Sequence, residues 1–121
     1  YWQPYNVNNG EEMHARMSRE DHEWACVTAA VLLVRKENFW LCEGFDEQYL
    51  YGYEDVDFCL KLQKRGLRNY CCGNCLVFHY EFGTQSTDEP TAVRERRARN
   101  MIIFRGKWQE YLQKRMENKE D

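Results

Sequence analysis

The amino-acid sequence predicts an α/β fold, with a small mixed sheet and flanking helices in a single domain of 121 residues. Two observations predict it. The run 27–34 is short, β-branched and apolar on both faces, which is typical of a strand buried between two layers. The runs 36–42, 54–65 and from Thr91 onward repeat their apolar residues at helical spacing. No internal repeat or linker divides the chain.

The first half of the chain is expected to contain that strand and two helices. Residues 1–23 are polar and are expected to be irregular. Residues 36–42 indicate a short helix ended by Gly44, because glycine readily takes a positive φ past a helix end. Residues 54–65 predict a longer helix, with acids in its first turn, cations in its last turns and a closing Gly66.

The second half is expected to contain two short strands and a long helix. The strands 67–72 and 75–81 flank a glycine-asparagine turn. From Thr91 onward the pattern is helical, and Gly106 is a candidate break in it. The charged residues 114–121 are expected to fray. One helix face carries the apolar side chains Met101, Phe104, Trp108, Tyr111 and Leu112.

The composition favours a folded domain with an aromatic-rich core and excludes several classes of protein. Eight Tyr and four Trp can each bury roughly 150–250 Å². The net charge of −3 provides no electrostatic footprint for nucleic acid, so no nucleic-acid partner is expected. Mean hydropathy is −0.85, and neither a membrane span nor a signal peptide is visible. The expected location is the cytoplasm, with membrane association only indirect, in the full-length protein.

The six cysteines predict buried thiols more than a metal site. Three of them stand where a small apolar residue would serve equally well, which fits a reducing compartment: Cys26, Cys42 and Cys59. Cys72 and Cys75, with Cys71 and His79, could instead supply zinc ligands. Strand alternation would separate Cys75 from His79 by roughly 13 Å, however. A small zinc-stabilised domain is therefore an alternative.

The acids that begin the predicted helix 54–65 are open to two interpretations. Glu54, Asp55 and Asp57 can accept the free N–H groups of a helix N-terminus and favour its dipole. A carboxylate at a rigid helix start, raised toward a cleft by Gly52, can also take a proton from a hydroxyl as a general base. A paired-carboxylate glycosidase is not expected, because neighbouring acids on one helix turn seldom flank a bond roughly 5–10 Å apart.

Two basic positions are also open to two interpretations. His79 lies near the end of a predicted strand, where ligands of open α/β sheets gather, although a packed or surface histidine fits as well. Arg94 and Arg97 belong to a basic run that is typical of a solvated helix face. A helix start that faces a cleft could instead bring one of them to a phosphate.

The order of these segments resembles the acceptor-side half of family 2 glycosyltransferases of the GT-A fold. The resemblance spans roughly 80 residues, most of them from Val27 to Ser86. Its motifs are Gly44-Phe45-Asp46-Glu47, Gly52-Tyr53-Glu54-Asp55-Val56-Asp57, Arg65-Gly66 and His79. The resemblance implies an inverting transfer of a sugar from a nucleotide-sugar donor to a saccharide or lipid-linked acceptor.

The resemblance also implies roles for particular residues. Asp55 would be the general base, Glu54, Tyr51 and Tyr53 would bind the acceptor, and His79 would meet the metal or the diphosphate. Trp40 could offer a ring for sugar stacking, although a core position suits it better. A divalent cation, Mn²⁺ or Mg²⁺, is expected in the complete enzyme. The residues expected to contact phosphate are Thr84, Ser86 and Arg94.

One departure from the family pattern is large. Family members carry the nucleotide-binding strands and an Asp-x-Asp metal motif before this region, whereas the single Asp-x-Asp here, Asp55 to Asp57, lies at the general-base position. The chain is therefore expected to be an acceptor half without its nucleotide-binding half. Donor binding would be weak, and an exposed sheet edge would favour self-association. A non-catalytic sugar-binding or interaction module derived from the same fold is the alternative.

Overall fold

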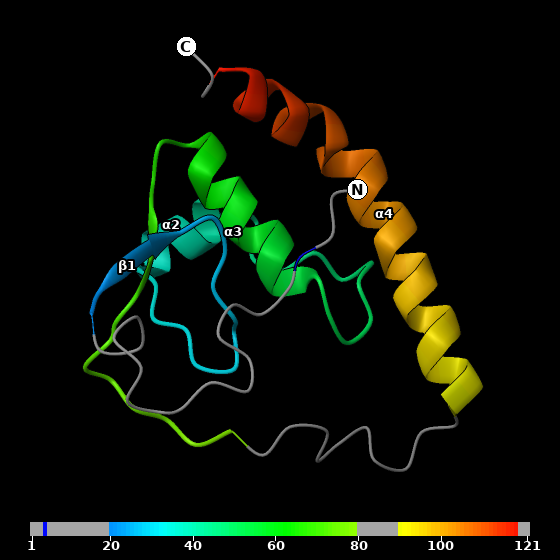
Figure 1. Ribbon diagram of the computed structural model, residues 1–121, viewed down its shortest axis with the longest axis horizontal. Helices are drawn as coiled ribbons and strands as arrows, with labels where there is room; N and C mark the ends of the chain where they lie inside the picture. The colour runs from blue at the N-terminus through cyan, green and yellow to red at the C-terminus, as the bar shows by residue number, and fades with distance from the viewer. Residues whose placement is uncertain (1–3, 5–19, 80–89, 119–121) are drawn as a thin grey trace.

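The computed structural model describes residue 4 and residues 20–79 and 90–118, in which α3 lies between α4 on one side and α2 with two short strands on the other (Figure 1). The elements in chain order are β1 (His22–Trp24), α2 (Lys36–Leu41), α3 (Glu54–Lys64), β2 (Asn69–Cys71) and α4 (Pro90–Glu117). The central element is α3, because both clusters of buried apolar side chains include residues from it.

Each cluster joins α3 to a different neighbour. One cluster packs α3 against α4 through Tyr49, Leu60, Phe104 and Trp108. This confirms the apolar face expected for the C-terminal helix, and full burial of such a side chain contributes about 1.5–3 kcal/mol. The other cluster packs α3 against α2 and the segment before it, and its buried members are Cys42, Phe58 and Leu62.

The helices begin and end close to the predicted residues. Gly44 follows α2 with a φ of +61°, and an added Cβ there would lie 2.9 Å from the Phe39 ring, so glycine is required. Helix α4 continues through Gly106 to Glu117. The residues expected to fray are therefore helical as far as Glu117, and (i, i+4) pairs such as Glu110–Lys114 support this end of the helix; fraying there stays a prediction.

The strand expected at 27–34 is not formed in the described residues. The chain turns at Ala29–Val31, and its backbone makes no ladder with another described segment. Leu32 and Val34 pack on the α3 cluster, whereas Leu33 is 98% exposed. The sequence suits a strand covered on both faces, but the described residues supply one covering layer and no neighbouring strand.

The second half of the expected hairpin is also absent from the described residues. Strand β2 lies within the predicted 67–72, but it pairs antiparallel with β1, a segment expected to be largely irregular. Trp24 lies opposite Asn69 in this register. Residues 75–79 are exposed and belong to no strand. Within the described residues the sheet therefore consists of two antiparallel strands, and the larger mixed sheet stays a prediction.

Candidate functional site

An open cleft of about 580 Å³ lies at the N-terminal end of α3. Its walls come from the loop before α3, from the segment that follows β1 and from the first half of α4. Five of the residues singled out in the sequence as part of a candidate site line it together, namely Tyr51, Gly52, Tyr53, Asp55 and Arg97, and Thr28 lines it with them. Its volume falls within the roughly 300–1,000 Å³ that is common for small-molecule sites.

The loop that leads into α3 has an unusual backbone conformation. Tyr51, Gly52 and Tyr53 have φ values of +52°, +126° and +74°, all in the left-handed half of conformational space. Glycine tolerates such angles, whereas a non-glycine residue there costs about 1–3 kcal/mol and persists only where its surroundings hold it. This conformation brings both tyrosines to the cleft.

Asn100 of α4 holds that loop. It is 1% exposed, and its amide makes three hydrogen bonds to the main chain of the loop: Nδ2 donates to Leu50 O at 2.9 Å and to Gly52 O at 2.9 Å, and Leu50 N donates to Oδ1 at 3.2 Å. Sequence reasoning missed this role. The available signal was its position, because 100, 104 and 108 form one stripe of the helix and the other two members are Phe104 and Trp108.

The two tyrosines are held differently. The Tyr53 ring stacks on Tyr49 at 6.4 Å between centroids and lies 5.2 Å from Phe104, so it joins the core to the cleft. The Tyr51 ring is 62% exposed, and the Arg96 guanidinium lies over it at 4.8 Å. Tyr51 is therefore the accessible aromatic surface of the cleft, and its guanidinium neighbour orders the ring.

Asp55 lies in the first turn of α3, and both of its carboxylate oxygens accept backbone hydrogen bonds. Val56 N donates to Oδ1 at 2.8 Å, and Ala29 N donates to Oδ2 at 3.0 Å. The turn that replaces the expected strand thus fixes this side chain. Each carboxylate oxygen has two lone pairs, so each keeps one acceptor position for a ligand hydroxyl. The geometry allows Asp55 to serve as a hydrogen-bond acceptor or general base for a group in the cleft.

Asp57, two residues later, has a different environment. It is 0% exposed, and its Oδ1 accepts from Trp108 Nε1 at 2.7 Å and lies 2.7 Å from Lys107 Nζ. Its Oδ2 lies 3.2 Å from Lys61 Nζ. These contacts tie α3 to α4 and so set the separation of two walls of the cleft.

Asp46, which is half-buried, shares Lys107 with Asp57. Its Oδ2 lies 2.9 Å from Lys107 Nζ. Burial acts to raise the pKa of Asp46, but the Gln48 N–H and Lys107 outweigh it and hold the pKa below its ordinary value. Burial acts to lower the pKa of Lys107, and its bonds to Asp57 and Asp46 outweigh that and raise the pKa.

Other sequence-predicted residues lie apart from the cleft. Glu54 is half-buried, and its Oε2 accepts from Gly52 N at 2.7 Å, so the observed contact of this carboxylate is with the loop. His79 and Arg94 are exposed and are not among the residues that line the cleft. Thr84 and Ser86 lie outside the described residues. Trp40 is 65% exposed, so the core position that suited it better is wrong.

The described residues do not fit a metal ion. Nowhere in residues 20–79 and 90–118 do three or more His, Cys, Asp or Glu side chains come together as a ligand group. The Asp55-x-Asp57 pair does not provide one, because Asp57 is enclosed by two lysines and Trp108. Any cation of a complete enzyme would need ligands from elsewhere.

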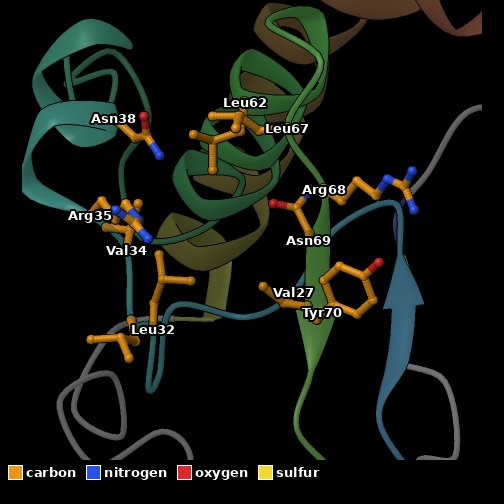
Figure 2. A pocket seen from close by; sticks show the side chains of 11 residues that line it. Val27, Leu32, Val34, Arg35, Asn38, Leu62, Leu67, Arg68, Asn69 and Tyr70 are labelled. Atoms are coloured by element: carbon orange, nitrogen blue, oxygen red, sulfur yellow. The ribbon is translucent and has the colours of Figure 1, made fainter.

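A second, smaller hollow of about 200 Å³ lies on another side of α3. Figure 2 shows Asn69 and Tyr70 of β2 on one side of it and Leu32 and Val34 on the other. It contains none of the site residues predicted from the sequence. Its edge is the extended segment that ends at Arg35, in which Leu33 is exposed.

Comparison with known proteins connects the chain to two much longer ones. The O-antigen biosynthesis protein RfbC of Myxococcus xanthus is 34% identical over 65 residues, which cover 54% of this chain and 5% of that protein. The uncharacterized protein y4gI of Sinorhizobium fredii (strain NBRC 101917 / NGR234) is 27% identical over 86 residues, which cover 70% of this chain and 10% of that protein. The chain thus corresponds to a small part of each.

Two further comparisons give no match. No family model matches the chain, and no solved structure matches it. In the described residues, no helix combines the length and the apolar character that crossing a membrane requires.

Proposed function

We propose that the chain is the acceptor-side part of a nucleotide-sugar-dependent glycosyltransferase of the GT-A type. The observation that carries the proposal is the cleft, where Tyr51, Tyr53 and Asp55 line one cavity at the start of α3. An exposed aromatic ring, that of Tyr51, beside a carboxylate suits a sugar, which offers an apolar ring face and hydroxyl groups. The partial similarity to a protein of O-antigen biosynthesis supports a role in carbohydrate biosynthesis.

In the proposed reaction, the acceptor sugar lies in this cleft with one hydroxyl at Asp55. As the hydroxyl oxygen forms its bond to the anomeric carbon of the donor, Asp55 takes the proton. The bond between the anomeric carbon and the diphosphate oxygen breaks, and the diphosphate leaves with the electron pair. Arg97, which lines the cleft, is available for an anionic group of either substrate. The expected Mn²⁺ or Mg²⁺ would act on the diphosphate, outside the described residues.

A non-catalytic sugar-binding module is the second candidate, and one observation favours it. Both oxygens of Asp55 already accept backbone N–H groups, so the carboxylate could serve only to fix the turn above α3. Such a module would keep the tyrosines and bind a saccharide without transferring a sugar.

Replacement of Asp55 by Asn in the full-length protein separates the two candidates. Sugar transfer would be measured with a panel of radiolabelled nucleotide-sugars and methyl hexopyranosides as acceptors. Loss of a general base is expected to reduce the transfer rate by about 10²–10⁴-fold, with saccharide binding retained. Glu47→Gln, an exposed acid outside the cleft, is the control and is expected to transfer normally. Undiminished transfer by Asp55→Asn would exclude Asp55 as the base, and binding without transfer by the unaltered protein would favour the module.

A further inference from the structure

The main chain of the loop that carries the two cleft tyrosines is bonded by one side chain of α4, Asn100, while Arg96 and Phe104 of the same helix contact the tyrosine rings. Asn100 lies 50 residues from Leu50 in the sequence, and its three hydrogen bonds all go to the main chain of Leu50 and Gly52. Figure 1 shows the segment before α3 lying between α3 and α4. An amide side chain is suited to this position because it both donates and accepts.

The left-handed conformation of the loop explains why it needs a clamp. Tyr51 and Tyr53 have positive φ values, which free peptides of these residues rarely adopt. Burial at Tyr51 contributes little to holding the loop, since that residue is 62% exposed and its ring contact is with the Arg96 guanidinium. Without the amide of Asn100, Leu50 O and Gly52 O would lose buried donors, and extended backbone conformations would compete with the observed one.

We propose that Asn100 is a positioning residue of the cleft, which keeps Tyr51 and Tyr53 in the arrangement that accepts a pyranose ring. This inference rests on the proposed function and deepens it by assigning sugar affinity to a contact between α4 and the loop. Apparent affinity falls in proportion to the population of the competent conformation. Asn100 lines the cleft but is 1% exposed, so its proposed effect on sugar binding acts through the loop.

A second buried asparagine provides a matched control. Asn69 is 5% exposed, and its Nδ2 donates to Ala25 O at 2.9 Å and to Cys59 O at 3.2 Å. It thus resembles Asn100 in burial and in the two carbonyls it satisfies, but it holds no part of the tyrosine loop. A purely structural role for both residues predicts equal effects on sugar affinity.

The test compares Asn100→Asp with Asn69→Asp in the intact chain. Each change keeps the shape of the side chain and replaces the Nδ2 donor with a carboxylate oxygen. That oxygen would face the two carbonyl oxygens to which Nδ2 donates. Dissociation constants for the methyl glycosides of glucose, galactose, mannose and rhamnose would be measured by saturation-transfer NMR, at a temperature where circular dichroism shows every variant folded. Asn100→Asp is expected to weaken sugar binding about tenfold or more. A loss of that size corresponds to a loop that adopts the binding conformation in about a tenth of the molecules. Asn69→Asp is expected to bind as the unaltered chain does.

A second pair of variants keeps the test decisive if Asn100→Asp does not fold. Gly52→Ala alters the loop where φ is +126°, with no atom within 4 Å of the added Cβ. Gly66→Ala has the same open surroundings and a φ of +77°, but it lies beyond α3, away from the cleft. Gly52→Ala is expected to weaken sugar binding and Gly66→Ala to leave it unchanged.

The outcomes separate this inference from the proposed function. Normal sugar affinity in Asn100→Asp or Gly52→Ala would overturn the positioning role while leaving sugar binding in place. So would a loss of affinity in Asn69→Asp and Gly66→Ala as large as in the variants that they control. Absence of binding by the unaltered chain would overturn the proposed function, and the positioning role with it. Where Asn100→Asp and Gly52→Ala both fold, their combination should weaken binding by less than the product of the single effects, because both act through one loop.

Discussion

Replacement of Asp57 by Asn is expected to destabilise the fold strongly, because the carboxylate is the buried centre of several contacts. Its two oxygens face Lys61, Lys107 and Trp108 Nε1, at 3.2, 2.7 and 2.7 Å. The variant leaves Lys61 without this carboxylate partner and leaves Lys107 with Asp46 alone. Removal of one partner of a buried ion pair typically costs about 3–5 kcal/mol, a large part of the roughly 5–15 kcal/mol that stabilises a domain.

Urea denaturation followed by tryptophan fluorescence measures this effect. With a slope of about 1.5 kcal/mol per M for a domain of this size, the expected loss lowers the unfolding midpoint by about 2–3 M. Asp55→Asn is the matched control, since it is the same change two residues earlier at a half-buried side chain with no ion pair to a described residue. Asp55→Asn is expected to lower the free energy of unfolding by about 1 kcal/mol. Equal midpoints for the two variants would refute the assignment of Asp57 to the structure and Asp55 to the cleft.

Three further predictions concern charge, surface and thiols. The stabilisation from Asp46, whose pKa is lowered, should be present above its ordinary value of 3.8 and lost as pH falls through the folded pKa. The stabilisation from Lys107, whose pKa is raised, should be present below its ordinary pKa of 10.5 and lost as pH rises through the folded pKa. Urea titrations from pH 2 to 12 should show the free energy of unfolding falling at both ends of this range. Lys107→Met should make both of these falls smaller. Leu33→Lys should reduce self-association in analytical ultracentrifugation without changing stability, because Leu33 is 98% exposed; undiminished association would place the contact elsewhere. In the native state Ellman's reagent should modify the three exposed cysteines rapidly and the others only on unfolding, because Cys42 and Cys59 are buried and the hydrogen bond with the Cys59 thiol, together with burial, raises the pKa of Cys26; six fast thiols would contradict this burial pattern. The exposed cysteines are Cys71, Cys72 and Cys75.

The helices could be predicted from the sequence because their signals are local. Apolar spacing, acids at the start and a glycine past the end predicted α2 and α3 to within a residue or so. The same local pattern predicted that Phe104 and Trp108 would be buried. Gly106 did not break α4, because one glycine costs only about 1 kcal/mol in a helix that packs on the core.

The strands could not be predicted in the same way, because a strand depends on its partner. The segment 27–34 has the composition of a buried strand, yet Leu33 is exposed and Ala29 donates instead to Asp55. Strand β2 was placed correctly, but its pairing with β1 is a contact across 47 residues that no local pattern indicates. Which segment completes a ladder is a property of the whole fold.

The site was predicted in part for a similar reason. Tyr51, Tyr53 and Asp55 are close in sequence, and the family resemblance singled them out together; all three line the cleft. Asn100 and Arg97 come from α4, and only the packing of α4 on α3 brings them to the cleft. The roles of Asp55 and Asp57 differ because of burial, which the repeated acid pattern did not reveal.

The most direct test of a sugar site at the start of α3 is to map binding on the chain itself. The amide resonances would be assigned, and their shifts followed during titration with the tightest-binding methyl glycoside. The largest shifts are expected at Tyr51, Gly52, Tyr53 and Asp55, with smaller ones at Thr28 and Arg97. Shifts confined to the smaller hollow around Leu32 and Tyr70, or the absence of any shift, would contradict a saccharide site in this cleft.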